Sequence, residues 1–184
     1  MRQVSLLYHD VVSGDPASSG FSGSDANVYK LPELQFQAHL AEIASIAQGR
    51  VRVVSLSWPV ATSEVPILFT FDDGGSSAHE PTALLLEARG WRGHFFIVTS
   101  RVGQRGFLTV EQIRDLYRRG HHIGSHSHSH PEAFSELSDE EMILEWSESR
   151  QVLGEILHDS PWSASVPGGY YSHRVALSAQ KAGF

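Results

Sequence analysis

The sequence predicts an α/β protein built on a parallel sheet, and three observations support this. Short apolar, β-branched runs alternate with helical patterns along the chain. Successive positions of these runs are apolar, as in strands that are buried on both faces of a helix-covered parallel sheet. No G-x-G-x-x-G motif follows the first run, which weakens the dinucleotide-binding version of an open sheet. We therefore expect a (β/α) barrel or an open doubly wound sheet.

Six segments are expected to be strands, with helices between them. The strands are VSLLY (4–8), VRVVSLSW (51–58), PILFTF (66–71), HFFIVTS (94–100), HHIGS (121–125) and SASV (163–166). Thr109 with Gln112 forms a capping box, a signature of a helix start. Ser138 with Glu141 forms a second one. The expected helices run from Pro32 to Gly49, through 84–86 to Gly90, from Thr109 to Gly120, from Ser138 through Ile156, and over 172–182.

The 184 residues are expected to form a single domain, 1–184, whose last helix ends where another strand would follow. A (β/α) barrel usually needs about 250 residues, so we expect the domain to lack its C-terminal strands. The strand edges exposed in this way would favour a homo-oligomer or a loosened C-terminal end. The stretch 11–27 is rich in Gly and Ser, and we expect a mobile loop there, with a substrate lid as the alternative.

Charge and composition exclude several classes of partner. A formal net charge of −7 and a pI near 5.8 argue against nucleic acid and anionic membranes. The chain contains no cysteine, which excludes disulfides and thiolate metal sites. No apolar run reaches the length of a membrane span or of a signal-peptide core. As written, the chain is expected in the cytoplasm, or outside it if a leader has been removed.

The segment HHIGSHSHSHP (121–131) holds five of the eleven histidines. Neutral imidazole is the commonest protein ligand for a transition metal. Both a turn-like and an extended conformation keep His126 and His130 on one side, so this pair is expected to share an ion. The alternative is a solvated His-rich loop with adventitious metal affinity.

Three expected strands deliver polar groups to one rim, because the carboxyl ends of parallel strands meet there. Asp72 and Asp73 follow PILFTF, His126 follows HHIGS, and the Pro-Gly-Gly turn around Gly168 follows SASV. One Asp with two His leaves an open coordination position, as in catalytic zinc sites. The other Asp would then be free to act as a base. On its own, the Asp-Asp-Gly sequence is more simply explained as an ordinary turn, and the nearby histidine motif is what favours a site.

Two motifs in this order, TFDDG (70–74) and H-[ST]-x-x-H (126–130), resemble those of the polysaccharide deacetylases, carbohydrate esterase family 4. The resemblance extends from about Pro66 to the C-terminus, and LLYHDV (6–11) is similar to the exopolysaccharide-type members. It implies a distorted (β/α) barrel, with Asp72 as the base. It also implies a divalent metal on Asp73, His126 and His130, most often zinc, with cobalt or nickel as alternatives. His128 is then expected to point away from the metal.

The resemblance has two departures. The family motif R-x-P-x-[GA] falls on residues 165–169, and its arginine, which orients the base, is replaced by Ser165. Loss of such a partner typically costs about 10- to 100-fold in activity, unless Arg174 or another group substitutes for that arginine. The family's general-acid histidine would lie beyond Phe184. His9, at the end of the first strand, could reach the same rim, although its simpler interpretation is a histidine that caps a strand end.

The implied activity is metal-dependent removal of N-acetyl groups from an amino-sugar polysaccharide or oligosaccharide, with the Gly168 N–H assisting at the oxyanion. The alternatives are an O-acetyl esterase, a cyclic-amide hydrolase of the same fold, and a non-catalytic protein that binds glycans or metal. Five aromatic residues could stack on sugar faces, although such residues more often belong to the core: Trp58, Trp91, Trp162, Tyr170 and Tyr171.

Overall fold

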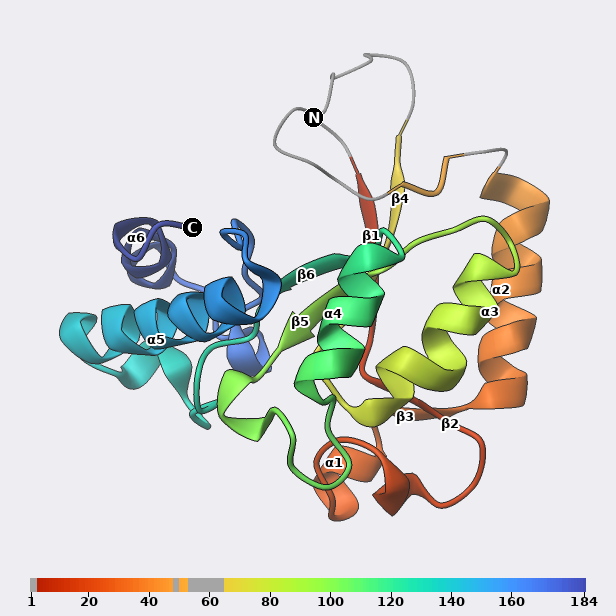
Figure 1. Cartoon of the computed structure of the whole chain (residues 1–184), viewed down its shortest axis with the longest axis horizontal. Coiled ribbons are helices and arrows are strands. Elements are labelled where there is room, and N and C mark those ends of the chain that lie inside the picture. Colours follow the sequence, from red (N-terminus) through yellow and green to blue (C-terminus); the bar gives the residue numbers. More distant parts are fainter. Residues whose placement is uncertain (1–2, 48–49, 53–64) are drawn as a thin grey trace.

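The computed structural model describes residues 3–47, 50–52 and 65–184 as an α/β fold with two parallel sheets (Figure 1). The larger sheet has the strand order β1-β4-β5-β6, formed by β1 (Val4–Tyr8), β4 (Ile67–Phe71), β5 (His94–Ile97) and β6 (His122–Ser125). The smaller sheet pairs β2 (Asp10–Val12) with β3 (Lys30–Pro32). The expected α/β class with parallel strands is therefore confirmed.

Four of the six expected strands are present as β1, β4, β5 and β6. Of the segment 51–58, Val51 forms a single bridge to Ile67, and residues 53–58 lie outside the described part of the chain. The segment 163–166 was expected to be a strand, but only Ala164 pairs, in one bridge to Ser125. The pairing ends there because Pro167 has no N–H to donate and the chain enters a tight turn.

The helices cover the larger sheet and extend beyond its β6 edge. They are α1 (Ser24–Asn27), α2 (Glu33–Ala47), α3 (Leu84–Glu87), α4 (Val110–Arg118), α5 (Asp139–Leu157) and α6 (His173–Lys181), with a π-helical turn over His79–Ala83 before α3. Short 3-10 turns occupy Pro16–Ser18, Ser76–Ala78, Thr99–Arg101, Phe134–Glu136 and Pro167–Gly169. In the described ranges, no helix combines the length and apolar composition that crossing a bilayer requires.

Local sequence signals determine several helix ends. Both expected capping boxes are present, at Thr109 before α4 and at Ser138 before α5, with reciprocal side-chain and backbone hydrogen bonds. Pro32, expected as the first helical residue of α2, is instead the last residue of β3. Its fixed φ suits a strand end as well as a first helical turn, so the tertiary pairing with Val12 decides between the two.

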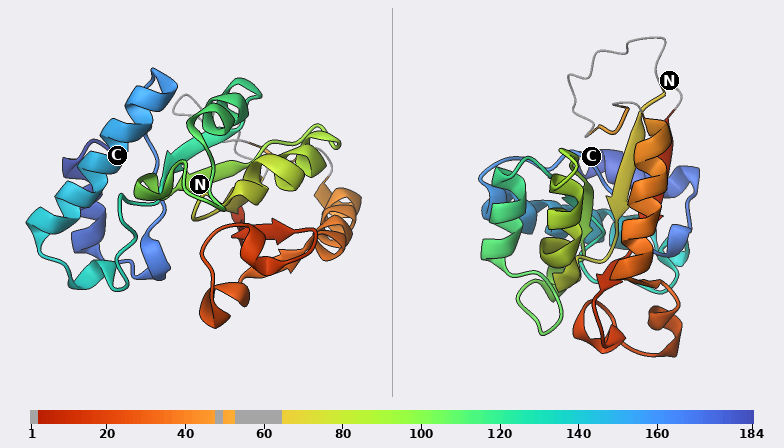
Figure 2. Two further views of the ribbon diagram at one scale, coloured as in Figure 1. Left: turned by 60° about the horizontal axis from the view of Figure 1, so that its bottom comes forward. Right: turned by 90° about the vertical axis from the view of Figure 1, so that its right-hand side faces the viewer.

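The core has two parts. The main cluster packs β-strand side chains such as Phe71 and Phe95 against α2, α4 and α5, through Leu40, Leu116 and Leu153 among others. The second cluster lies between α5 and α6 and consists of Phe134, Met142, Trp146 and Val175. Figure 2 shows α5 and α6 side by side at one end of the molecule, whereas the small sheet and α1 lie across the carboxyl ends of the large-sheet strands.

The segment 11–27 was expected to be a mobile loop, but it is folded. It contributes most of β2, a 3-10 turn and α1. The Lys30 ammonium donates hydrogen bonds to the carbonyl groups of Pro16, Ser19 and Phe21. Buried Asp10 accepts hydrogen bonds from the hydroxyl groups of Ser19 and Ser77. These long-range contacts hold the segment against the rest of the domain.

Candidate active site

Asp72 and Asp73 directly follow β4 and are both buried. The chain bends sharply here, because Asp73 (φ 73°) and Gly74 (φ 79°) are both in the left-handed region. A non-glycine residue in that region is uncommon and is maintained by its surroundings. The Asp73 carbonyl accepts a hydrogen bond from Val98 N–H, which ties the bend to the end of β5.

His126 and His130 follow β6 in a turn that is neither helix nor strand. Ser127 and His130 are left-handed, with φ values of 65° and 59°. The Ser127 hydroxyl accepts a hydrogen bond from His130 N–H, and the Ser125 hydroxyl accepts one from Ser127 N–H. The turn brings the two imidazole rings to a centroid distance of 5.1 Å.

Asp73, His126 and His130 form the one group among the described residues whose ligand atoms all lie within 4.8 Å of one another. Asp73 Oδ1 is 3.5 Å from His126 Nε2 and 3.7 Å from His130 Nε2. Two ligands about 2.1 Å from a tetrahedral zinc ion would themselves be about 3.4 Å apart, so these spacings suit a shared cation.

Two further observations test whether these residues fit a metal. Asp73 Oδ1 is buried and has no hydrogen-bond partner in the structure, which is costly for an isolated carboxylate oxygen. The His126 Nδ1–H donates to the Ser165 carbonyl at 3.0 Å, which leaves the Nε2 lone pair directed at Asp73. Metal-binding histidines usually carry such a hydrogen bond on their other ring nitrogen. The residues present therefore fit a divalent metal.

His128 lies outside this group. Its Nδ1 is 3.0 Å from Thr99 Oγ1, and its Nε2 is 3.7 Å from Glu148. Its backbone N–H and that of Ser129 both donate to the Glu145 carboxylate, so α5 fixes this part of the turn.

Asp72 is held by the residue that replaces the family arginine. The Ser165 hydroxyl donates to Asp72 Oδ2 at 2.9 Å. Arg174, expected as a possible substitute, instead pairs with Asp139 and donates to the Leu137 carbonyl on the surface. Asp72 Oδ2 also lies 3.8 Å from His126 Nε2, which places the second aspartate beside the three-residue group.

Burial dominates the electrostatics of the site. Burial raises the pKa of Asp72 to about 6, against the opposing effects of His9 and the Ser165 hydrogen bond. Burial, followed by repulsion from Asp72 and Asp10, raises the pKa of Asp73 to about 7. Burial lowers the pKa of His126 to about 4. The imidazoles therefore favour their neutral form, and the nearby carboxylates resist ionisation. A bound cation would reverse the effect on the carboxylates, because it stabilises their charged form.

These residues line a cavity of about 730 Å³. His9 lines it as well, and its pKa is lowered by burial and raised by the charge of Asp72. Gly168 also lines the cavity, with a φ of 62°, and a Cβ there would lie 2.8 Å from the Tyr170 ring.

Sequence reasoning missed one wall of this cavity, which the folded segment 10–30 supplies. Its lining residues are Asp10, Phe21, Ser22, Asp25, Ala26, Tyr29 and Lys30. Phe21 lies against His130, with a centroid distance of 5.3 Å, and so contacts one of the three grouped residues. The available signal was Asp10, a carboxylate next to His9 at an expected strand end.

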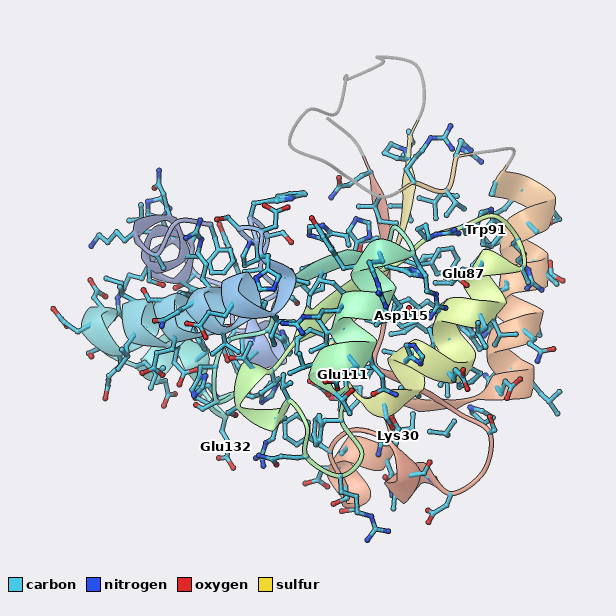
Figure 3. All side chains as sticks on the ribbon, viewed as in Figure 1. Lys30, Glu87, Trp91, Glu111, Asp115 and Glu132 are labelled. Carbon is cyan, nitrogen blue, oxygen red and sulfur yellow. The ribbon has the colours of Figure 1, made fainter. Side chains whose placement is uncertain are left out.

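Of the five aromatic residues considered as sugar contacts, the four that the structure describes do not line the cavity. Trp91 stacks on Phe69 in the core and lies at the other end of the molecule from Lys30 (Figure 3). Trp162 packs against His122, near the start of β6. Tyr170 and Tyr171 are exposed beyond the Gly168 turn, and Trp58 lies outside the described residues.

Comparison with known proteins is consistent with this geometry. The chain is 24% identical over 183 residues to YxkH of Bacillus subtilis, covering 97% of this chain and 61% of that protein. It is 29% identical over 130 residues to the peptidoglycan-N-acetylglucosamine deacetylase of Bacillus cereus, covering 70% of this chain and 58% of that protein. The chain thus spans about three fifths of the length of these relatives.

Solved structures show the same fold. The Streptococcus pyogenes deacetylase PplD in complex with acetate superposes with a TM-score of 0.80 at 16% identity, covering 100% of this chain and 81% of that one. IcaB from Ammonifex degensii gives a TM-score of 0.75 at 20% identity, with the same coverage. The expected distorted barrel of the deacetylases is therefore confirmed as the fold. The family model for polysaccharide deacetylase matches residues 60–184, more than half of the sequence, and the chain belongs to the polysaccharide deacetylase family.

Proposed function

We propose that this domain removes N-acetyl groups from an amino-sugar polysaccharide or oligosaccharide, with Asp73, His126 and His130 holding one divalent metal. One observation carries the proposal. The three ligand atoms lie within 4.8 Å of one another, beside Asp72, on the wall of a 730 Å³ cavity. The names of related peptidoglycan and chitin deacetylases support the same reaction class.

The metal would be zinc, with cobalt or nickel as alternatives. When bound, it lowers the pKa of water and polarises an acetyl carbonyl. The protein's own part is to hold the ligands in place. The Ser165 carbonyl fixes the His126 tautomer, and the packing of Phe21 limits how far the His130 ring can turn.

Asp72 is the proposed general base. Its Oδ2 is held by Ser165, and its Oδ1 is buried without a partner, free to receive a proton from a water molecule in the cavity. Its raised pKa suits this role, because a base with a pKa close to the working pH both accepts and releases protons readily.

His9 is the proposed proton donor to the leaving amine. It lines the cavity; burial lowers its pKa, and the negative charges of Asp72 and Asp10 partly oppose this shift. Its ring packs at 4.9 Å from the Tyr29 ring, which restricts its orientation. The N–H of Gly168, which also lines the cavity, is proposed to stabilise the oxyanion.

The main competing activity is hydrolysis of O-acetyl esters, which uses the same groups but depends less on an acid, because an alkoxide leaves more readily than an amine anion. Cyclic-amide hydrolysis and a non-catalytic role in binding glycans or metal compete less directly. Acetate release from an N-acetylglucosamine oligosaccharide and from an acetylated xylan distinguishes these cases. We expect release from the amide substrate; activity on the ester alone would favour the esterase, and no turnover of either would favour a different substrate or a binding role.

His128, in the same histidine-rich segment, provides a control for the assignment of the metal ligands. His126→Ala and His130→Ala should each abolish stoichiometric zinc binding and acetate release. His128→Ala should leave both nearly unchanged, because its ring is engaged with Thr99 and Glu148. Equal effects of all three substitutions, measured by metal analysis after dialysis, would indicate a nonspecific histidine cluster.

A further inference from the structure

The charged side chains that line the cavity are predominantly acidic. Five carboxylates line it, and Lys30 is the one lysine or arginine among the described lining residues: the carboxylates are Asp10, Asp25, Asp72, Asp73 and Glu132. A single divalent metal would not reverse this balance. A substrate that carries its own carboxylate would therefore meet a field of like charge.

Lys30 is not available to neutralise such a carboxylate. Its ammonium has three N–H donors, and the carbonyl groups of Pro16, Ser19 and Phe21 each accept from it, two of them at 2.6 Å. Moving the ammonium to a ligand would leave these three carbonyls without their donor. Lys30 thus serves the fold of the wall, not the substrate.

Two of the acids that line the cavity, Asp25 and Glu132, come from outside the group of Asp72, Asp73, His126 and His130. Asp25 comes from α1 and Glu132 from the turn after His130, so the cavity is flanked by carboxylates from two separate elements. Both side chains are exposed, and neither forms an ion pair within the described residues. Figure 3 shows Glu132 and Lys30 on the side of the molecule that carries α1.

Arg101 lies near the cavity but does not add a positive charge to its lining. The Arg101 guanidinium lies 5.3 Å from the Phe21 ring centroid and donates to Gln104. It does not line the cavity. Leu7, Phe21 and Tyr29 contribute apolar and aromatic surface to the lining, which suits the uncharged faces of a sugar ring.

We propose that the cavity selects glycans without carboxylates, namely N-acetylhexosamine homopolymers that are neutral or already carry free ammonium groups from earlier deacetylation. This inference rests on the proposed deacetylase function and specifies its substrate class. A free ammonium on a neighbouring sugar would be attracted by Asp25 and Glu132, whereas a lactyl or uronic carboxylate would be repelled. A like charge about 8 Å from a solvated carboxylate weakens binding roughly two- to threefold, so the two acids together should give about fivefold discrimination.

The test measures binding separately from turnover. The probes are a tetrasaccharide of alternating N-acetylglucosamine and N-acetylmuramic acid with free lactyl carboxylates, and the same molecule with lactyl carboxamides. Their dissociation constants are measured on the zinc-loaded Asp72→Asn protein, which keeps the cavity but lacks the proposed base. We expect the carboxamide to bind about fivefold more tightly, with the ratio shrinking as salt is raised, because exposed charges are screened.

Variants assign the effect to the two acids. The additional substitutions Asp25→Asn and Glu132→Gln, made together, should reduce the ratio to about one. Glu42→Gln, an exposed carboxylate on α2 outside the cavity, is the matched control and should leave the ratio unchanged. Equal or tighter binding of the free carboxylate, an unchanged ratio in the double variant, or no binding of either probe would each overturn the inference.

Acetate release by the unmodified protein from an N-acetylglucosamine tetrasaccharide completes the comparison. If the binding ratio behaves as expected and no acetate is released, the deacetylase function is wrong while the charge selectivity of the cavity holds. If acetate is released and the ratio is close to one, the function holds and the substrate class is wrong.

Discussion

Ser165 holds two of the proposed active-site side chains at once. Its hydroxyl donates to Asp72 and its carbonyl accepts from His126. Only the hydroxyl is lost on substitution by alanine, so the two functions can be separated. Ser165→Ala should bind zinc normally, because the carbonyl remains, and should lose about 10- to 100-fold in kcat, because Asp72 loses the partner that orients it.

The matched control is Ser163→Ala. Ser163 lies two residues away, but its hydroxyl contacts His122 instead of Asp72. It should have a much smaller effect on kcat, and Ser165→Thr should recover part of the lost activity. A loss of zinc in Ser165→Ala, or equal losses of kcat in the two alanine variants, would show that Ser165 acts on general stability.

At the residue scale, the strand-end positions of the two motifs predicted that both aspartates and both histidines meet at one rim. The family resemblance then singled out Asp73, His126 and His130 as the group. The sequence did not predict the partner of Asp72. That hydrogen bond joins residues 93 positions apart, and the motif comparison suggested a missing arginine. Which donor reaches a carboxylate depends on the path of a distant segment, which no local pattern encodes.

At the scale of elements, the segment from β2 to β3 differs most from what its sequence indicates. Its Gly and Ser content indicates a loop, yet Lys30 gathers three carbonyl groups of the segment and Asp10 gathers two hydroxyl groups. The capping boxes of α4 and α5 were predictable because all their partners lie within three residues. The folding of 11–27 was not, because its stabilising contacts are made at longer range.

Lys30→Met tests the role of this segment. Three carbonyl groups would lose their charged donor, in two partly buried hydrogen bonds and one exposed one. A hydrogen bond to a charged group contributes about 1.5–3 kcal/mol, so the free energy of unfolding should fall by about that amount. KM should rise more than kcat falls, because the substitution loosens the wall that Phe21 and Tyr29 belong to and leaves Asp72 in place.

Lys181→Met, in the exposed last turn of α6, is the control for removal of a lysine charge. It should change the free energy of unfolding by no more than about 0.5 kcal/mol, as surface substitutions usually do. Urea denaturation and steady-state kinetics give the two readouts. A Lys30→Met protein as stable as the Lys181→Met protein would mean that the segment is held by other contacts.

At the scale of the whole molecule, burial of histidine governs the response to pH. Six histidines have a pKa lowered mainly by burial: His9, His94, His121, His122, His126 and His130. The unfolded chain binds protons at these sites below about pH 6.5, whereas the folded chain resists them down to about pH 4 at three of the six. The stability they contribute is fully present above pH 6.5 and is lost as the pH falls towards 4.

Asp72 and Asp73 act in the opposite direction. Their folded-state pKa values are raised to about 6 and about 7, so their contribution is present below about pH 4 and is lost as the pH rises through these values. Because the six buried histidines outnumber the two aspartates, the metal-free protein should lose stability overall as the pH falls from 6.5 to 4. Thermal unfolding at a series of pH values measures this loss of stability. A melting temperature that is constant or increases on acidification would show that the buried histidines do not dominate the response to pH.

The raised pKa values of Asp72 and Asp73 also imply that the effect of metal on stability depends on pH. Adding zinc at pH 7.5 should raise the melting temperature, because a cation stabilises both charged carboxylates in the folded state only. At pH 5 the increase should be smaller, because protons compete with the metal for the carboxylate and imidazole ligands.

The most direct measurement is the zinc content and the rate of acetate release of the Asp72→Asn protein, with the unmodified protein beside it. The arrangement of Asp72 next to Asp73, His126 and His130 predicts one equivalent of zinc in both proteins. It also predicts a fall of about 10²- to 10⁴-fold in acetate release in the variant, the usual size of a general-base contribution. Loss of zinc from Asp72→Asn would mean that Asp72 is a ligand, and undiminished acetate release with zinc retained would mean that another group is the base.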